Sequence, residues 1–117
     1  MTPNSNCIFC KIAAGQIPAK VVYEDPRVMA FRDVQPQSPV NILIIPKKHI
    51  ESLLSVKPDD LSLVAEIHQV AKNIAQSEPL LKEGFRLVTN TGKNGGQSVS
   101  HLHTHLLGGR ALAWPPG

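Results

Sequence analysis

Hydrophobic and polar residues in the first half of the 117-residue chain follow patterns typical of β-strands. Residues 20–24 and 28–32 are rich in β-forming side chains, and the Asp25-Pro26 pair between them favours a turn, so the two runs predict a hairpin. Residues 41–45 are apolar enough for a strand that is buried on both faces, and Pro46 ends that run. This half of the chain therefore predicts three strands.

Helical periodicity is found in two places. Residues 7–14 predict a short helix that is capped by Asn6, and Gly15 followed by Pro18 would end it. One long helix is predicted over 58–76, because apolar side chains recur there at steps of three and four residues. The predicted apolar face comprises Leu61, Val64, Ala65, His68, Ala71, Ile74 and Ala75, so the histidine among them is expected to be packed rather than to bind a ligand.

Two more strands are predicted over 84–90 and 98–107, with a polar, glycine-rich loop over 91–97 between them. With connections this short, the order helix, three strands, helix, two strands favours an α+β fold. Its expected form is an antiparallel five-stranded sheet with one long and one short helix. A chain of 117 residues has room for one core, so residues 1–117 are predicted to form a single domain.

Composition and charge narrow the classes of partner. The net charge of +3 suits a phosphate-bearing ligand without requiring one. The aromatic residues, one Trp, one Tyr and three Phe, are too scattered for a nucleic-acid-binding face, so no nucleic-acid partner is expected. Met1–Asn6 lacks the basic and apolar stretches of a secretory signal, and runs such as 42–45 are far shorter than the ~20 residues that span a bilayer. We expect a cytoplasmic protein with no membrane contact.

Three histidines, His101, His103 and His105, occupy every second position of the last predicted strand. Because side chains alternate faces along a strand, the three imidazoles are expected on one face. Such a row is a costly way to fill a core, since each buried ring brings two nitrogens that need partners. The loop before the row offers glycines, amides and the hydroxyl of Ser98, from which loops build phosphate-binding pockets. Loop and row are therefore expected to form one site.

The run Gly-Gly-Gln-Ser-Val followed by His-Leu-His-Thr-His-Leu-Leu resembles the histidine triad (HIT) family, whose motif is H-φ-H-φ-H-φ-φ with φ apolar. Thr104 departs from the motif, but it is β-branched and should keep the strand. The likeness extends over nearly the whole chain from about Cys7 onward and is to the Hint branch. The further segments that carry it are Phe31–Val34, Ile45–Ile50, Val88–Asn90, Gly108–Arg110 and Trp114–Gly117.

The resemblance implies a HIT-like fold and hydrolysis of a purine nucleoside 5′-phosphoramidate through a nucleotidyl-histidine intermediate. His103, the middle histidine, would be the nucleophile, with one neutral ring nitrogen attacking phosphorus and the other donating its hydrogen to a backbone carbonyl. His101 would supply that backbone or a supporting ring, and His105 would contact the phosphate. Ser98 would bond the phosphate or the leaving group, and His49 completes the candidate catalytic set.

The same match implies which side chains hold the nucleotide. Asp33 would accept hydrogen bonds from ribose hydroxyls, and Asn90 would line the phosphate side. A symmetric homodimer is also implied, in which the tail with Trp114 reaches toward the partner's pocket. The expected nucleotide contacts are Asp33, Val34, Asn90, Gly96, Gln97, Ser98, His103 and His105.

Cys7 and Cys10 have the spacing of a zinc-binding pair, and with His49 and His101 they could complete a tetrahedral site. Some histidine triad relatives carry such a structural zinc and others lack the cysteines. Two cysteines on a short helix are otherwise commonly buried as small apolar residues. A structural zinc is thus left open, and no cofactor is expected to be required for catalysis.

Three alternatives to this function stay open. Two histidines of the row could bind a catalytic zinc that activates water. The same pocket could belong to a nucleotide-binding or partner-binding module without catalysis. The third alternative, within the family, is a dinucleoside polyphosphate hydrolase. The uridylyl-transferring branch typically has glutamine at the position of His105, so the histidine favours a hydrolase over a transferase. Lys47-Lys48 is expected to be a solvated connector.

Overall fold

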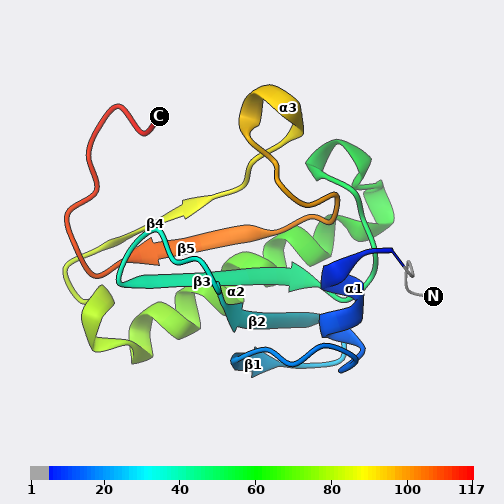
Figure 1. Ribbon diagram of the computed structural model, residues 1–117, viewed down its shortest axis with the longest axis horizontal. Coiled ribbons are helices and arrows are strands. Elements are labelled where there is room, and N and C mark those ends of the chain that lie inside the picture. Colours follow the sequence, from blue (N-terminus) through cyan, green and yellow to red (C-terminus); the bar gives the residue numbers. More distant parts are fainter. Residues whose placement is uncertain (1–5) are drawn as a thin grey trace.

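The computed structural model describes residues 6–117 and contains the predicted antiparallel five-stranded sheet, in the order β1-β2-β3-β5-β4 (Figure 1). Two predictions include residues 1–5, which lie outside the described residues: the single domain over 1–117 and the lack of a secretory signal in Met1–Asn6. The strands are β1 (Val21–Glu24), β2 (Val28–Arg32), β3 (Val40–Pro46), β4 (Phe85–Val88) and β5 (Thr104–Gly108). No helix in the described part of the chain is long and apolar enough to cross a membrane.

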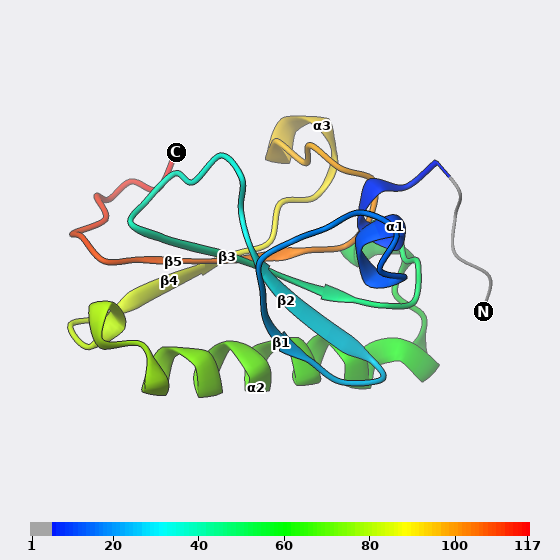
Figure 2. The ribbon, with the colours of Figure 1, turned by 60° about the horizontal axis from the view of Figure 1, so that its bottom comes forward.

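The sheet separates two layers of apolar side chains. The long helix α2 (Leu61–Ser77) covers one face, and α1 (Ile8–Ala13) and α3 (Gly92–Gly95) lie on the other side (Figure 2). Strand β3 is buried throughout, as predicted, because Ile42 and Ile44 join the core beneath α2 while Leu43 and Ile45 pack with α1. The α1 side of the sheet carries the polar site described below.

The predicted hairpin between β1 and β2 is confirmed. One carboxylate oxygen of Asp25 accepts hydrogen bonds from the backbone N–H groups of Arg27 and Val28, at 2.7 and 2.8 Å. Aspartate closes turns in this way because its short side chain reaches the backbone two and three residues on. Strand β1 is an exposed edge, whereas every residue of β2 but Arg32 is buried.

The predicted long helix is confirmed, and so is the burial of Ala71, Ile74 and Ala75, but in the first half of the helix the predicted face was displaced by about one position. A 3₁₀ turn, η2 (Pro58–Asp60), precedes α2, in keeping with the frequency of such turns at helix starts. His68 is exposed and its Nδ1 bonds the carbonyl oxygen of Val64 at 2.9 Å, so the expectation of a packed histidine was wrong. The buried residues of α2 are Leu63, Ile67, Val70, Ala71, Ile74 and Ala75.

Two local predictions also need correction. Helix α1 is capped by Cys7, whose sulfur accepts a hydrogen bond from the backbone N–H of Cys10 at 3.3 Å, and not by Asn6. The last strand starts at Thr104 rather than at 98, and β4 stops at Val88. Residues 98–103 form an irregular segment.

Residues 6–117 contain two further 3₁₀ turns, η1 (Leu53–Ser55) and η3 (Pro79–Leu81), which flank α2 together with η2. The Lys47-Lys48 connector is solvated as expected, and both ammonium groups form ion pairs. Lys47 pairs with Glu24 and Lys48 with Asp60, which ties the end of β3 to β1 and to the start of α2.

Candidate functional site

The three histidines reach one side of the sheet although only His105 lies in a strand. The backbone N–H of Leu102 donates to the carbonyl of Ile50 at 2.6 Å, which holds the irregular segment beside the end of β3. Leu102 joins the core beneath α2. The neighbouring imidazoles of His101 and His103 therefore point to the opposite side, where both rings contact Phe9 of α1. The predicted alternation holds even where no strand forms.

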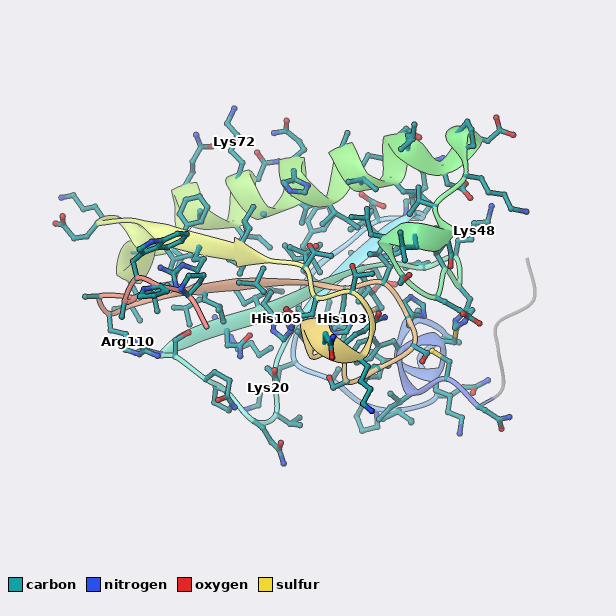
Figure 3. All side chains as sticks on the ribbon, turned by 90° about the horizontal axis from the view of Figure 1, so that it is seen from above. Lys20, Lys48, Lys72, His103, His105 and Arg110 are labelled. Atoms are coloured by element: carbon teal, nitrogen blue, oxygen red, sulfur yellow. The ribbon has the colours of Figure 1, made fainter. Side chains whose placement is uncertain are left out.

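The backbone holds the neutral His103 ring in one tautomer. Its Nδ1 lies 2.7 Å from the carbonyl oxygen of His101, and its side chain is 3% exposed. A carbonyl oxygen only accepts hydrogen bonds, so Nδ1 carries the hydrogen and a neutral ring keeps its lone pair on Nε2. The rings of Phe9 and His105 stand edge-on to it with centroids at 5.1 and 5.2 Å. His103 and His105 lie next to each other near the middle of the molecule (Figure 3). This is the geometry that a histidine nucleophile requires.

A pocket of about 270 Å³ opens beside the His103 and His105 rings. Asp33 and Ser98 supply further polar groups at its lining. A hollow of about 660 Å³ adjoins it and shares Asp33 and Val34 with its lining, whereas a hollow of about 520 Å³ elsewhere on the described chain has no histidine in its lining. The apolar wall comprises Ile8, Phe9, Ile12, Ile17, Phe31, Leu43 and Val99.

The apolar wall was missed by the sequence analysis. Phe31 and Leu43 were assigned to predicted strands, and Phe9 to a predicted helix, so their hydrophobicity was explained by core formation. Hydrophobicity alone does not distinguish a core position from the lining of a cavity. The helix α1 on that side of the sheet is much shorter than α2 on the other side, so it covers less of the sheet. This difference in helix length is a signal that could have indicated a cavity there.

Asp33, Asn41 and His105 are linked by hydrogen bonds at the pocket's polar end. The carboxylate of Asp33 accepts from the backbone N–H of Gln35 at 2.9 Å and from Nδ2 of Asn41 at 3.3 Å. Nδ1 of His105 lies 3.4 Å from Oδ1 of Asn41. Burial, and then the proximity of His103, lower the pKa of His105, so this ring is neutral at neutral pH. Val34 also lines the pocket, but it is 93% exposed.

Three of the expected phosphate contacts lie around α3 and outside the lining of the pocket. Gly96 ends α3 with φ of 78°, a left-handed conformation that favours glycine. The side-chain amide of Gln97 accepts from the N–H of Gly92 at 3.1 Å and donates to the carbonyl of Glu51 at 2.6 Å. Asn90 lies two residues before α3. Gln97 thus fixes the loop against the segment after β3 and places the exposed Ser98 at the pocket.

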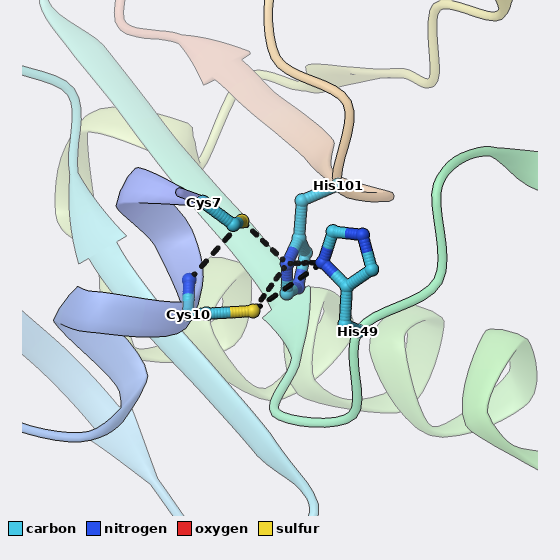
Figure 4. Close-up of side chains that lie close together, drawn as sticks. All are labelled: Cys7, Cys10, His49 and His101. Carbon is cyan, nitrogen blue, oxygen red and sulfur yellow. Dashed lines mark hydrogen bonds between the residues drawn. The ribbon is translucent and has the colours of Figure 1, made fainter. Parts of the chain in front are cut away.

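Cys7, Cys10, His49 and His101 converge beneath α1 (Figure 4). Their ligand atoms all lie within 4.8 Å of one another, and His101 Nδ1 is 3.2 Å from the sulfur of Cys7 and 3.5 Å from that of Cys10. The Nδ1 atoms of His49 and His101 are 3.2 Å apart. Ligands at the usual Zn–S and Zn–N distances in a tetrahedron are about 3.3–3.8 Å apart, so the four residues fit a closed zinc site.

His101 is prepared for metal binding by its second nitrogen. Nε2 donates to the carbonyl oxygen of Pro46 at 2.8 Å, which leaves the lone pair on Nδ1 for a metal. The ring is fully buried, and burial lowers its pKa to about 4. The neutral form that binds metals therefore predominates at neutral pH. The same residue supplies the carbonyl that holds His103, so the metal cluster and the candidate nucleophile share one stretch of backbone.

Comparison with known proteins agrees with this geometry. The family model described as "Scavenger mRNA decapping enzyme C-term binding" matches residues 6–112. A protein of Synechococcus elongatus, described as an uncharacterised HIT-like protein, is 53% identical over 97% of this chain and 99% of its own length.

Two solved structures are similar to this chain in fold, and one of those two proteins is described as zinc-bound. The crystal structure of a HIT family hydrolase from Legionella pneumophila is 56% identical, with a TM-score of 0.92 over 96% of this chain and all of that chain. A zinc-bound histidine triad family protein from Mycobacterium smegmatis is 29% identical, with a TM-score of 0.79 over 96% of this chain and 80% of that one. With the matching sheet, the histidine row and the relatives named above, this chain belongs to the histidine triad (HIT) family of hydrolase-like proteins.

Proposed function

We propose that this protein hydrolyses purine nucleoside 5′-phosphoramidates through a nucleotidyl-histidine intermediate on His103. The observation that carries the proposal is the 2.7 Å hydrogen bond from Nδ1 of His103 to the carbonyl of His101. It leaves Nε2 of the neutral ring as the free nucleophilic nitrogen beside the pocket. The Hint-like sequence features support the choice of a phosphoramidate among the substrates of the family.

In the proposed first step, Nε2 of His103 attacks the phosphorus atom and a P–N bond to the ring forms. The bond from phosphorus to the leaving nitrogen breaks, and that nitrogen departs as an amine with a proton from Nε2 of His105, which has first taken up that proton from solvent, while Ser98 would hydrogen-bond the leaving group. In the second step, water attacks phosphorus and passes a proton to Nε2 of His105, while Nε2 of His103 leaves with its electron pair, which restores the neutral ring of His103. Two displacements replace one difficult hydrolysis.

Binding is proposed to use the two ends of the pocket. A purine would lie against the apolar wall that includes Phe9 and Phe31, where a flat apolar ring loses little hydration energy. The carboxylate of Asp33 would accept from the ribose hydroxyls, beside Val34. The phosphate would meet Ser98, His103 and His105, with Asn90, Gly96 and Gln97 shaping the loop behind it.

We also propose that Cys7, Cys10, His49 and His101 hold a structural zinc. The closed set of four ligands supports a structural role, because a catalytic site keeps an open position for water. His49 and His101 would then contribute to catalysis through the position of the His103 backbone. No cofactor is proposed for the chemical step itself.

A homodimer and a cytoplasmic location complete the proposal. Strand β4 is an edge of the sheet, and Phe85 on it is 45% exposed. Arg86 of the same strand donates to the carbonyl of Ala113 at 2.9 Å and so holds the tail, whose Trp114 is 81% exposed. A second copy covering this edge would bury both aromatic side chains. Light scattering of the purified protein tests the dimer.

The rival catalytic-zinc mechanism has less support from the ligand geometry. Among the described residues, the cluster that could hold a metal takes only His101 from the row and includes neither His103 nor His105. A metal bound there would lie beside the backbone support of the nucleophile. Activity that survives prolonged chelation would agree with this arrangement.

The decisive experiment compares adenosine 5′-phosphoramidate with a dinucleoside polyphosphate in the wild type and in His103→Ala. We expect turnover of the first substrate, poor use of the second, and near-complete loss in the variant. Acid quenching during turnover should trap one nucleotide on the wild-type chain, and mass spectrometry should locate it on His103. Tight nucleotide binding without turnover would instead support the non-catalytic binding module, and preference for the dinucleotide would support the other hydrolase.

A further inference from the structure

Asn41 lies between Asp33 and His105, two polar residues in the lining of the pocket. It lies in β3 and is 3% exposed. Its Nδ2 is 3.3 Å from Oδ2 of Asp33, and its Oδ1 is 3.4 Å from Nδ1 of His105. The backbone N–H of Asp33 also donates to the carbonyl of Asn41 at 3.0 Å. The carboxylate and the imidazole are therefore joined through a single buried amide.

The chemistry of these groups determines the orientation of the amide. An ionised carboxylate has no hydrogen to donate, so only the NH₂ end of Asn41 can face Asp33 favourably. The amide oxygen then faces His105. Because that oxygen only accepts, Nδ1 of His105 must carry the hydrogen, and the lone pair of the neutral ring is on Nε2. The charge of Asp33 thus selects one tautomer of a ring with which it has no direct hydrogen bond.

We propose that Asn41 is a positioning residue that transmits the charge of Asp33 to His105 and fixes that ring as the Nδ1–H tautomer. The catalytic consequence rests on the proposed function. Phosphate oxygens only accept, so His105 must take up one proton from solvent at Nε2 before it can donate to a bound phosphate. Asp33, through the polarised amide of Asn41, stabilises the imidazolium that results. Asp33 would then link ribose recognition to the protonation of the group that faces the phosphate.

The tautomer is tested first in the ligand-free protein, by long-range ¹H–¹⁵N NMR of the imidazoles at pH 8. The signals of His105 are assigned by their loss in His105→Gln. We expect the wild type to show a protonated Nδ1 and an unprotonated Nε2. Both Asn41→Leu and Asp33→Asn should yield a mixture of tautomers, the second because a neutral amide at 33 accepts either orientation of Asn41.

A matched control is Thr104→Val, which removes a buried hydrogen bond on the other face of β5 without touching the His105 ring. Its tautomer should equal that of the wild type, and thermal melts should show that every variant is folded. A wild-type His105 protonated on Nε2, or the same single tautomer in Asn41→Leu, would overturn the inference. Neither result depends on the protein being an enzyme.

Kinetics and calorimetry then test the consequence. Asn41→Leu should lower kcat for adenosine 5′-phosphoramidate by up to about 100-fold with a smaller change in KM, because a misoriented group costs rate more than binding. Calorimetry of AMP binding in two buffers of different ionisation enthalpy should show uptake of about one proton by the wild type and less by the variant. Unchanged kcat and proton uptake in the variant would overturn the inference, whereas an inactive wild type with the expected tautomers would refute only the proposed function.

Discussion

Phe9 is the side chain that joins the metal cluster to the candidate nucleophile. It is 6% exposed, and its ring stands edge-on to Phe31, His101 and His103 with centroids at 5.5, 5.9 and 5.1 Å. The ring also forms part of the apolar wall of the pocket. Truncation in Phe9→Ala should therefore reduce both the stability of the fold and the order of the His103 ring.

The size of the effect follows from these contacts. Replacing a buried phenylalanine by alanine costs about 3–5 kcal/mol. Phe9 borders the pocket, so solvent can fill part of the void, and we expect the lower end, about 3 kcal/mol. For a domain of this size that lowers Tm by about 10 °C. With its edge contact removed, His103 can rotate, and misplacement of a reacting group by about 1 Å costs up to about 100-fold in kcat.

The assay pairs thermal denaturation with turnover of adenosine 5′-phosphoramidate at a temperature where every protein is folded. The control is Ile67→Ala, which truncates a side chain of α2 that is 1% exposed on the opposite face of the sheet. It should lower Tm by a similar amount and leave kcat unchanged. If Phe9→Ala loses stability but keeps full kcat, the ring only fills the core, and the reasoning is refuted. Equal loss of kcat in both variants would refute it as well, since the effect would then be global.

Three other predictions follow from the site and its support. Burial and the proximity of His103 lower the pKa of His105, so as the pH falls the unfolded chain takes up a proton before the folded chain does. The free energy of unfolding should therefore fall as pH decreases below about 6.5. In urea titrations, His105→Gln should show a weaker dependence of that free energy on pH. The hydroxyls of Thr89 and Thr104 are 2.6 Å apart, so Thr104→Val should cost about 1 kcal/mol by leaving Thr89 unpaired, and a double-mutant cycle with Thr89→Val should show the combined loss to be less than the sum. Removal of zinc by chelation should lower Tm while part of kcat remains, and metal analysis should find stoichiometric zinc in the wild type but not in Cys10→Ser; complete loss of kcat on chelation, with Tm unchanged, would contradict a structural role.

The histidine row shows how far local patterns reach into the site. Alternation of His101, His103 and His105 with apolar residues was sufficient to place the imidazoles together, although a regular strand forms only from Thr104. The side-chain alternation persists because the intervening Leu102 must be buried beneath α2, whatever the hydrogen bonding of the backbone. The prediction that the three imidazoles lie on one side was therefore correct, although the strand predicted over 98–103 does not form.

The face of α2 shows the opposite case. Steps of three and four residues fit more than one stripe on a helix. The predicted stripe was correct at Ala71, Ile74 and Ala75, but in the first half of α2 it passed through His68 instead of the buried Ile67. The sheet beneath the helix decides between them, and a local pattern contains no information on that contact. The cap of α1 was misassigned because asparagine is a commoner capping residue than cysteine, whereas the structure uses the sulfur of Cys7.

The amino-acid sequence by itself determined that five strands and a long helix form, the α+β class and the residue types of the site, because these depend on periodicity and on side-chain chemistry. Only the tertiary structure decided which groups meet: the carbonyl of His101 with Nδ1 of His103, and Asn41 between Asp33 and His105. Hydrogen bonds at 2.7–3.4 Å are set by the register of β3 against β5 and by the path of the segment before β5. These are long-range arrangements, whereas the patterns along the chain report only on near neighbours.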